Sequence, residues 1–444
     1  MGLLGRLCYL APATNGTAPI GGGIAMTRPL SRRAFIRTAT IVGAATPLLP
    51  SLLARPIFAA PASGAGALVR RVAGVDPEGG EGGPLDAPAG AENLVSLATP
   101  VRVAVNHSYI SPLVELFGDV WVGRKVFVAG NTILRADPGG RVTIGDETNL
   151  QDNILLLALR GGSVAAPLGA ALTSSAGERT SIAHQAIIRN SAIGDFAFVG
   201  FRARLDNAIL EDGAFVLHGA TIANVRIPRD RLVPIGALIT TQAQADALPL
   251  KEEAQAEFQR EVLEVNEEFA EHYAEQYEQG GFDAVTGISP APKTSFNPTP
   301  VAPTLGVNVR LEEFARIVGD VRLGANSVVG RRTSIRADEG APIIIGENAE
   351  IEDRVTFHAL KGTSIRIGRN LDSDDNVVFH GPLEVGDNLI IGDDAVLFRC
   401  TVGDGVTIST GAVVVGVTIP DGVRIPEHAV ITTQNQVDAL ASRV

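Results

Sequence analysis

Hydrophobic residues recur at every sixth position from about residue 94 onward, a spacing that fits neither an α-helix nor an ordinary strand. Val122, Val128 and Leu134 follow this spacing, and Gly-Asp or Gly-Glu often comes directly after the hydrophobic residue, as in Ile144-Gly145-Asp146. Six-residue repeats are typical of β-helices, in which three short strands and three tight turns make one coil of about 18 residues. We therefore predict a β-prism in which these side chains point inward and stack on their equivalents in the next coil.

The six-residue pattern occurs twice along the chain. Adding 201 to the position of Leu134 gives Ile335 in the second copy, and adding 192 to the position of Val199 gives Ile391. The offset changes because the first copy is expected to carry a longer central loop, around residues 160–180. The sequence therefore predicts an all-β fold of two tandem parallel β-helix domains.

The predicted domain boundaries follow from where the repeat starts and stops. The first β-helix domain is expected over residues 94–248 and the second over residues 303–441. Residues 249–302 should form a helix and a proline-rich linker. We expect the helix from Lys251 to Gln279, lying along the first prism, because this charged stretch lacks Gly and Pro and has apolar residues at helical spacing.

The N-terminal region resembles an export signal. Ser31-Arg32-Arg33 opens a twin-arginine pattern, and the apolar stretch after it is too short and too often broken by proline for a stable transmembrane span. We predict a twin-arginine signal peptide over residues 26–67, a flexible leader over residues 68–93, and hence a periplasmic or extracellular protein. The net charge of -12 argues against nucleic acid as a partner, because phosphate binding needs a basic face.

Three histidines are divided between the two copies. His358 and His380 lie in the second copy, and His184 lies in the first, at the place where the second copy has Asp375. The phenylalanines that precede His358 and His380 are 22 positions apart, one coil plus a short bulge, so both histidines should stack on one face. His184 should lie on the adjacent face, near Gln151, and such faces meet when prisms pack side by side.

This distribution predicts a metal site of three histidines between a first copy and a second copy. Neutral imidazoles bind Zn²⁺, Fe²⁺ or Co²⁺ and leave one position open for water. An alternative stays open, because second copies that associate only with each other would use His358, His380 and Asp375 as ligands. The remaining histidines have no matching partners and are predicted at the surface: His107, His218, His272 and His428. A hexapeptide acyltransferase would use one histidine as a general base, and His218 is the candidate for that role.

Short motifs in both copies resemble the gamma-class carbonic anhydrases. In the second copy these motifs are Arg336-Ala337-Asp338-Glu339-Gly340, Phe357-His358-Ala359-Leu360 and Phe379-His380-Gly381-Pro382. In the first copy they are Arg135-Ala136-Asp137, Asn149-Leu150-Gln151-Asp152 and Ser181-Ile182-Ala183-His184-Gln185. The resemblance covers both repeat domains. The repeat by itself is less specific, because many acyltransferases share it.

Proteins of that family are trimers of left-handed β-helices with a metal ion between subunits. The resemblance therefore implies two left-handed prisms and a homo-oligomer built from trimeric rings. It assigns His358 and His380 as ligands from one prism and His184 as the ligand from its neighbour. Two Arg-x-Asp pairs are implied to form salt bridges across interfaces: Arg135 with Asp137, and Arg336 with Asp338.

The activity implied by the resemblance is the reversible hydration of carbon dioxide to bicarbonate by hydroxide at a Zn²⁺, Fe²⁺ or Co²⁺ ion. Glu339 matches a proton-shuttle carboxylate of the family, and Gln151 and Asn149 are expected to hydrogen-bond the hydroxide or bicarbonate. Lys361 stands in place of the family's second shuttle glutamate. The altered residues around Asp375 and Leu157 make a non-catalytic scaffold or bicarbonate binder the alternative function. A hexapeptide acyltransferase is less favoured, because acyl-CoA donors are cytoplasmic and the chain is expected to be exported.

Overall fold

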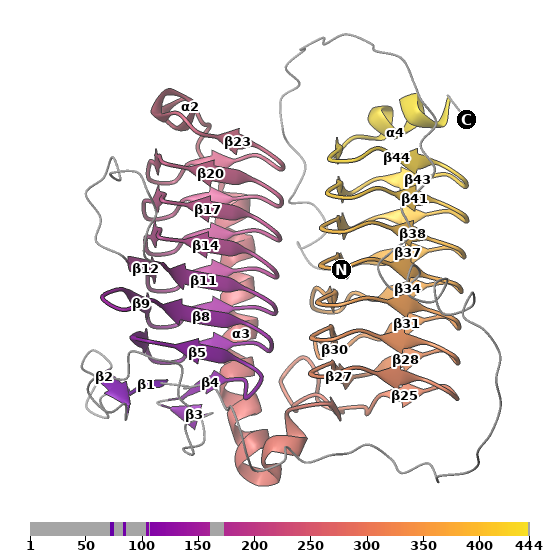
Figure 1. Cartoon of the computed structure of the whole chain (residues 1–444), viewed down its shortest axis with the longest axis horizontal. Coiled ribbons are helices and arrows are strands. Elements are labelled where there is room, and N and C mark those ends of the chain that lie inside the picture. Colours follow the sequence, from indigo (N-terminus) through magenta and orange to yellow (C-terminus); the bar gives the residue numbers. More distant parts are fainter. Residues whose placement is uncertain (1–71, 75–82, 86–103, 106, 160–172, 443–444) are drawn as a thin grey trace, which may run out of the picture. The chain divides into compact units, whose positions relative to one another are not determined.

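The computed structural model describes residues 72–74, 83–85, 104–105, 107–159 and 173–442 of the 444-residue chain. The repeats form two parallel β-helices, each with three sheets wound around a hydrophobic core (Figure 1). We call them the first prism, from β3 to β23, and the second prism, from β24 to β45. They belong to one compact unit of the chain. The predicted fold class, two tandem left-handed β-helices in an all-β protein, is confirmed.

The first prism has three parallel sheets, each named after one of its strands. The β10 sheet contains β3 (Ala104–Val105), β4 (Ser108–Ile110), β7 (Phe127–Val128), β10 (Asn149–Leu150), β13 (Ser181–Ile182), β16 (Phe198–Val199), β19 (Phe215–Val216) and β22 (Leu232–Val233), with β3 antiparallel to β4. The β11 sheet contains β5 (Glu115–Phe117), β8 (Ile133–Ala136), β11 (Leu155–Ala158), β14 (Ile187–Arg189), β17 (Arg204–Asp206), β20 (Thr221–Ala223) and β23 (Leu238–Ile239). The β12 sheet contains β6 (Val120–Val122), β9 (Arg141–Ile144), β12 (Thr173–Ala176), β15 (Ala192–Ile193), β18 (Ile209–Leu210) and β21 (Arg226–Ile227).

The second prism repeats this arrangement. The β33 sheet contains β24 (Ile288–Ser289), β27 (Arg316–Gly319), β30 (Ser334–Ala337), β33 (Thr356–Ala359), β36 (Val378–Gly381), β39 (Val396–Phe398), β42 (Val413–Val415) and β45 (Val430–Ile431). The β34 sheet contains β25 (Thr304–Leu305), β28 (Val321–Leu323), β31 (Ile343–Ile345), β34 (Ile365–Ile367), β37 (Leu383–Val385), β40 (Thr401–Val402) and β43 (Thr418–Ile419). The β35 sheet contains β26 (Arg310–Leu311), β29 (Val328–Val329), β32 (Glu350–Ile351), β35 (Asp372–Ser373), β38 (Ile390–Ile391), β41 (Thr407–Ile408) and β44 (Arg424–Ile425).

The six-residue pattern predicts the inward positions correctly. Leu134 and Val199 lie in the core of the first prism, and Ile335 and Ile391 occupy the matching places in the second core. Parallel register repeats these contacts coil after coil, as where Leu134 pairs with Leu156. Burying such a side chain stabilises the fold by about 1.5–3 kcal/mol, so the stability of each prism accumulates over its coils.

The Gly-Asp pairs of the repeat cap the coils. The Asp212 Oδ1 atom accepts a hydrogen bond from the backbone N–H of Asp195, one coil earlier, at 3.0 Å. A Cβ atom on Gly194 would lie only 2.5 Å from that same oxygen. Glycine is therefore required beside the capping aspartate, which gives the Gly-Asp signature a steric cause.

An asparagine ladder runs along one corner of the second prism. Its members, Asn308, Asn326, Asn348, Asn370 and Asn388, have φ values between 58° and 61°. Asparagine tolerates this left-handed conformation better than most residues, so it suits a corner at which every coil must turn sharply. The side-chain amides of the first four members each donate to the Oδ1 atom of the next at 2.9–3.4 Å.

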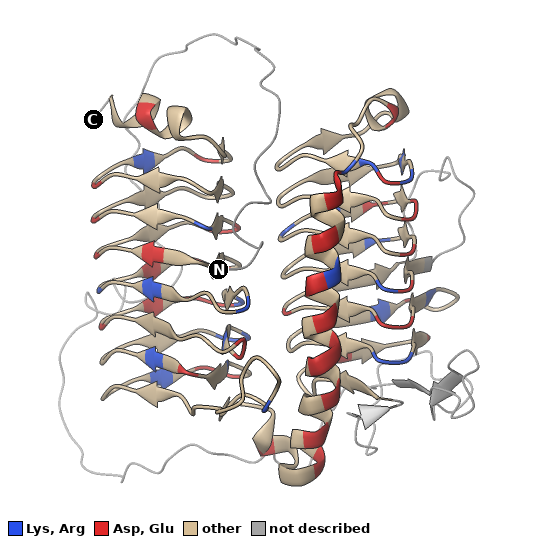
Figure 2. Ribbon diagram, turned by 180° about the vertical axis from the view of Figure 1, so that it is seen from behind, with Lys and Arg blue, Asp and Glu red and all other residues tan. Residues whose placement is uncertain are grey.

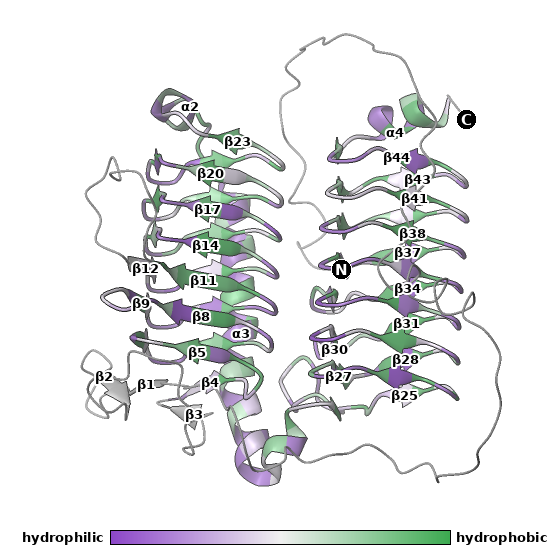
Figure 3. Ribbon diagram, viewed as in Figure 1, coloured by the Kyte–Doolittle hydropathy of each residue, from purple (hydrophilic) through white to green (hydrophobic). Residues whose placement is uncertain are grey.

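Helix α3 (Glu253–Gly280) connects the prisms and packs on the first prism, as expected. It begins two residues after the predicted start, and Gly281 ends it with a φ of 69°. Phe269 and Tyr273 of α3 contact Tyr109 and Phe127. Glutamates line its outer side (Figure 2), and hydrophilic residues prevail along it (Figure 3). In the described part of the chain, no helix is long and apolar enough to cross a membrane.

The remaining elements are short. Helix α2 (Gln242–Asp246) follows the first prism, η2 (Phe282–Ala284) follows α3, and α4 (Gln434–Ala441) follows the second prism. The expected long loop is shorter than residues 160–180, because Thr173–Ala176 forms β12 and pairs with β9 and β15. Within the expected flexible leader, β1 (Val72–Gly74) and β2 (Gly83–Leu85) pair antiparallel. The predicted signal peptide lies outside the described residues.

Candidate metal centre

Three histidine side chains from the two prisms meet at one place. His358 lies in β33, His380 lies in β36, and His184 lies in the turn after β13. One ring nitrogen of each lies within 4.8 Å of the others, and each residue is at most 2% exposed. Among the described residues, these three make the one cluster of histidine, cysteine and carboxylate side chains close enough to share a metal ion.

Strand register places each of these histidines. His358 pairs with His380 in parallel register, so both rings project from the same side of the β33 sheet, one coil apart. His184 comes two residues after Ile182, which pairs with Leu150 on the β10 sheet of the first prism. Contact between the prisms brings the His184 Nε2 atom to 3.1 Å from the His358 Nδ1 atom.

Carboxylates face the far side of the His358 ring. Its Nε2 atom lies 3.3 Å from Asp338 Oδ1 and 3.2 Å from Glu339 Oε1. The Arg336 Nη2 atom also lies 3.3 Å from Nε2, but the carboxylates are acceptors and hold a proton there. Nδ1 is therefore the nitrogen that a cation in the cluster would use. Carboxylates that orient a metal-binding histidine in this way are a common second layer of metal sites.

The other two rings are oriented by different groups. The Nδ1 atom of His380 donates to the Gly381 carbonyl oxygen at 3.3 Å, which leaves Nε2 as the acceptor. The Nδ1 atom of His184 lies 3.4 Å from Asp152 Oδ2 and accepts from the Asp152 backbone N–H at 3.3 Å. These two contacts favour opposite tautomers of His184, and a cation at Nε2 would select the one with a proton on Nδ1.

The donor set fits a divalent ion that prefers imidazole. Nitrogen ligands of a tetrahedral zinc ion at 2.0–2.1 Å lie about 3.3 Å from one another, close to the 3.1 Å between His184 and His358. Each of the three rings has one nitrogen engaged outside the cluster and one available within it. These residues could hold Zn²⁺, Fe²⁺ or Co²⁺.

A buried ion-pair network joins the prisms beside the histidines. The Arg336 Nη1 atom lies 2.7 Å from Asp152 Oδ2 of the first prism, and its Nε atom lies 3.0 Å from Asp338 Oδ2. Burial by itself raises the pKa of Asp152, but the Arg336 charge, together with His184 and the hydrogen bond from Ser334, outweighs burial and lowers this pKa to about 2. The pKa of Asp338 is lowered in the same way. Both carboxyl groups are therefore ionised at neutral pH.

The pKa values of the histidines diverge. Burial lowers the pKa of His184 to about 4 and, with the charge of His358, depresses that of His380 strongly. Burial and Arg336 also oppose the charged form of His358, but the carboxylates of Asp338 and Glu339 outweigh them and raise its pKa to about 9. The His184 and His380 rings are thus neutral at neutral pH, and His358 would have to release a proton to bind a cation.

Polar corners of the two prisms meet around this centre. The Gln185 Nε2 atom donates to the Arg354 carbonyl oxygen at 2.7 Å and contacts Thr356 Oγ1 at 3.2 Å. The Asn153 Nδ2 atom donates to Thr356 Oγ1 as well, at 3.2 Å. Arg202, which is only 8% exposed, forms an ion pair with Asp394 across the same contact.

Comparison with known proteins places this arrangement in a family. The chain is 34% identical over 180 residues to a carbonic anhydrase from Methanosarcina thermophila, which covers 38% of this chain and 73% of that protein. The chain belongs to the gamma-class carbonic anhydrase family. No family model matches the sequence.

The carboxysome assembly proteins among the relatives are longer than this chain. The carboxysome assembly protein CcmM from a Nostoc species is 34% identical over 161 residues, 36% of this chain and 29% of that protein. The chain thus matches about a third of the length of such relatives. Among solved structures, a hexapeptide transferase family protein from Anaplasma phagocytophilum is 20% identical, with a TM-score of 0.29, and the match covers 37% of this chain and 91% of that one.

Of the polar residues expected around the metal, Glu339 contacts the histidine cluster, and Asn149 and Gln151 lie at the strand beside the one that precedes His184. The Glu339 carboxylate contacts His358 directly, and Glu339 is 8% exposed. Asn149 and Gln151 flank Leu150 on β10, in register with the strand that precedes His184. Asn149 donates to Ser181 Oγ at 2.8 Å. The Asn149 Oδ1 and Gln151 Oε1 atoms are buried without a hydrogen-bond partner in the described structure.

The remaining predicted residues lie away from the cluster. Arg135 pairs with Asp137 at 2.8 Å within the first prism, and about half of the Arg135 side chain is exposed. An interface role for this pair would need a further chain. Asp375 accepts the Asp353 backbone N–H at 2.8 Å on the second prism, and it is not a member of the three-histidine cluster. Its role as an alternative ligand stays a prediction.

Sequence reasoning missed two residues of the centre. Asp152 contacts both His184 and Arg336, and its register with His184 could have identified it. Tyr273 of α3 donates to Asp338. The tyrosine carried no sequence signal, because its contact depends on how α3 packs.

The predicted surface position of His218 is wrong. His218 is 2% exposed and stacks on Phe201 at a ring distance of 4.3 Å. Phe201 also stacks on His380 at 4.5 Å, and Phe398 of the second prism contacts the His218 ring at 5.2 Å. Contact between the prisms therefore buries a histidine that a single prism would leave exposed.

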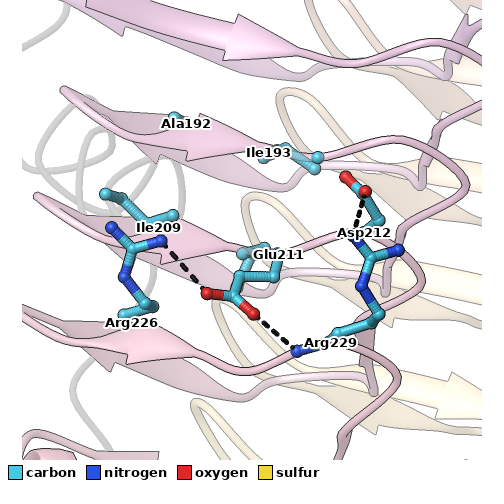
Figure 4. A pocket seen from close by; sticks show the side chains of 9 residues that line it. Ala192, Ile193, Ile209, Glu211, Asp212, Arg226 and Arg229 are labelled. Atoms are coloured by element: carbon cyan, nitrogen blue, oxygen red, sulfur yellow. Dashed lines mark hydrogen bonds and ion pairs between the residues drawn. The ribbon is translucent and has the colours of Figure 1, made fainter.

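A surface pocket of the first prism lies on another sheet. It is formed by β15, β18 and β21 of the β12 sheet, and Figure 4 shows Glu211 between Arg226 and Arg229. The Arg226 Nη1 atom lies 3.1 Å from Glu211 Oε1, and the Arg229 Nη2 atom lies 2.6 Å from Asp212 Oδ2. These charges compensate one another at the surface, and the pocket contains none of the clustered histidines.

Proposed function

We propose that this chain binds a divalent metal ion with His184, His358 and His380 and catalyses the reversible hydration of carbon dioxide. The observation that carries the proposal is the orientation of the rings. Each histidine has one nitrogen held by Asp152, by Asp338 and Glu339, or by the Gly381 carbonyl oxygen, and the other nitrogen faces the cluster. A histidine cluster without a ligand role would have no need for three separate orienting groups.

The protein residues would divide the chemistry among them. A bound ion supplies Lewis acidity that brings the pKa of water close to 7. The unpaired oxygens of Gln151 and Asn149 can accept hydrogen bonds from that water and from the hydroxyl group of bicarbonate. Attack of water on carbon dioxide forms one C–O bond, opens one C=O π bond and releases one proton, which gives bicarbonate. Glu339, whose Oε1 atom lies 3.2 Å from His358 Nε2, would receive this proton and pass it toward solvent.

A non-catalytic role is the second candidate. Two observations favour it: the chain is similar to carboxysome assembly proteins, and the three histidines are at most 2% exposed. A buried ion could then serve only to hold the prisms together. Metal bound without hydration activity would identify this role.

An acyltransferase is disfavoured by the surroundings of His218. Its Nδ1 atom accepts the Phe201 backbone N–H at 3.1 Å, and the ring is packed between Phe201 and Phe398. A general base must reach the proton that it removes, and this histidine is enclosed.

The deciding experiment measures metal content and carbon dioxide hydration on protein purified without oxygen. The composite site predicts about one metal ion per chain, with loss of metal and activity in His184→Ala and in His358→Ala. Asp375→Ala is the matched control and should retain both. Unchanged metal content in His184→Ala, with loss in Asp375→Ala, would replace the composite site by one between second prisms. Metal-free, inactive protein after addition of Zn²⁺ or Fe²⁺ would refute the enzyme.

Export and assembly are part of the proposal. The twin-arginine route predicts that replacing Arg32 and Arg33 by lysine retains the protein in the cytoplasm, which cell fractionation would detect. A homo-oligomer built from trimeric rings predicts a mass by analytical ultracentrifugation that is a multiple of the single chain. A monomeric mass would refute that assembly.

A further inference from the structure

Helix α3 reaches from the first prism to a carboxylate of the second. The Tyr273 hydroxyl donates to Asp338 Oδ2 at 2.6 Å. Tyr273 is 4% exposed and Asp338 is fully buried. A short hydrogen bond from a hydroxyl to a carboxylate is among the stronger kinds in proteins, and burial strengthens it further.

This hydrogen bond determines which oxygen of Asp338 faces His358. Tyr273 and the Arg336 Nε atom both engage Oδ2, at 2.6 and 3.0 Å. Oδ1 has no other partner in the described structure and lies 3.3 Å from His358 Nε2. Two donors on one oxygen prevent rotation of the carboxylate, so the second oxygen stays directed at the histidine.

The tyrosine ring is itself held in place. Tyr273 stacks on Tyr109 at a ring distance of 5.2 Å and contacts Phe127 at 5.8 Å. The Arg336 guanidinium lies 5.5 Å from the rings of both Phe127 and Phe269. The aromatic cluster thus fixes the positions of both donors to Asp338.

We propose that Tyr273 is a positioning residue of the metal centre, acting through Asp338 to orient His358 for the ion. The inference rests on the proposed function only in assuming that the histidines bind a metal. It gives α3 a role in the centre beyond joining the prisms. Residues that act on a ligand through another group commonly change metal affinity by about 10–100-fold.

The test compares two variants that each lose one buried hydroxyl. Tyr273→Phe removes the donor to Asp338 and keeps the ring. Tyr109→Phe is the matched control, because Tyr109 belongs to the same aromatic stack and is 3% exposed. Metal-free wild type and variants are titrated with Co²⁺, and both the dissociation constant and the visible absorption spectrum are recorded. The spectrum reports ligand geometry, which a loss of overall stability would leave unchanged.

We expect Tyr273→Phe to bind Co²⁺ about tenfold more weakly than wild type and with a changed spectrum, whereas Tyr109→Phe matches wild type in both. Equal affinity and spectra for the two variants would overturn the inference while leaving the metal site intact. A wild-type protein that binds no Co²⁺ would overturn this inference and the proposed function together. A wild type that binds Co²⁺ but hydrates no carbon dioxide would refute only the proposed activity.

Discussion

Replacing Arg336 with methionine should break the connection between the prisms more than any change at the surface. The guanidinium lies 2.7 Å from Asp152 Oδ2 and 3.0 Å from Asp338 Oδ2, and both carboxylates are at most 1% exposed. Methionine has a similar length and no charge, so Arg336→Met removes the cation and leaves two carboxylates buried beside each other.

The expected loss of stability in Arg336→Met follows from this burial. Removing one partner of a buried ion pair costs about 3–5 kcal/mol, because the remaining charge has no water to solvate it. Here two carboxylates share one arginine, so the loss should lie at the upper part of that range. An exposed pair contributes at most about 1 kcal/mol. Arg369→Met provides this comparison, because 61% of the Arg369 side chain is exposed in its pair with Asp387.

One tryptophan makes the assay selective. Trp121 is the single tryptophan of the chain and lies in β6, so its fluorescence reports the first prism. Circular dichroism reports the strands of both prisms. In urea, with a chelator present, wild type should unfold with coincident fluorescence and dichroism curves, because the buried contact couples the prisms. In Arg336→Met the curves should separate and the summed free energy of unfolding should fall.

A clear result would refute this reasoning. If Arg336→Met kept coincident curves and lost no more stability than Arg369→Met, the buried network would not couple the prisms. The double variant with Asp152→Leu gives a further check. It should be less destabilised than the sum of the single variants, because it leaves no unpaired charge at Asp152.

Three further predictions concern stability. Burial and the Arg399 charge lower the pKa of His218 to about 3, so between pH 6.5 and 3 only the unfolded state takes up a proton. As the pH falls through that window, the free energy of unfolding should fall by about 1.4 kcal/mol per pH unit. The difference in thermal stability between pH 7 and pH 5 should therefore be smaller in His218→Asn than in wild type. Gly194→Ala should cost about 1–3 kcal/mol by urea unfolding, because its Cβ would lie 2.5 Å from Asp212 Oδ1; an unchanged midpoint would contradict this. Asn348→Ala should cost about 2 kcal/mol, through a left-handed φ and two lost ladder bonds, and Asn348→Gly should recover part of the loss.

The sequence predicts the prisms well because their inward positions are set by local spacing. Leu134 and Ile335 could be placed by counting in sixes, and both are core residues. Counting in sixes did not predict strand β12, because its inward residue is Ala176, which pairs with Ile144 and Ile193. A small side chain there gives no periodic hydrophobic signal.

The sequence predicts the candidate metal centre only where strand register decides the position of a side chain. Counting coils places His358 and His380 one above the other, which parallel pairing shows. It could not reveal that His218 is buried, because the covering group is Phe398 of the other prism. The contact of Tyr273 with Asp338 depends on tertiary packing in the same way. A residue that is buried by the other prism or by α3 shows no sign of that burial in the spacing of its own repeat.

The covalent connection between the prisms through α3 changes how the centre responds to dilution. Ligands supplied by separate subunits come apart when the concentration falls below the dissociation constant of the assembly. Here His184 of the first prism belongs to the same chain as His358 and His380 of the second prism. The effective concentration of one prism around the other is therefore about millimolar or above, whatever the protein concentration. Cleavage of the connection near Gly281, where α3 ends, should therefore make metal retention dependent on protein concentration.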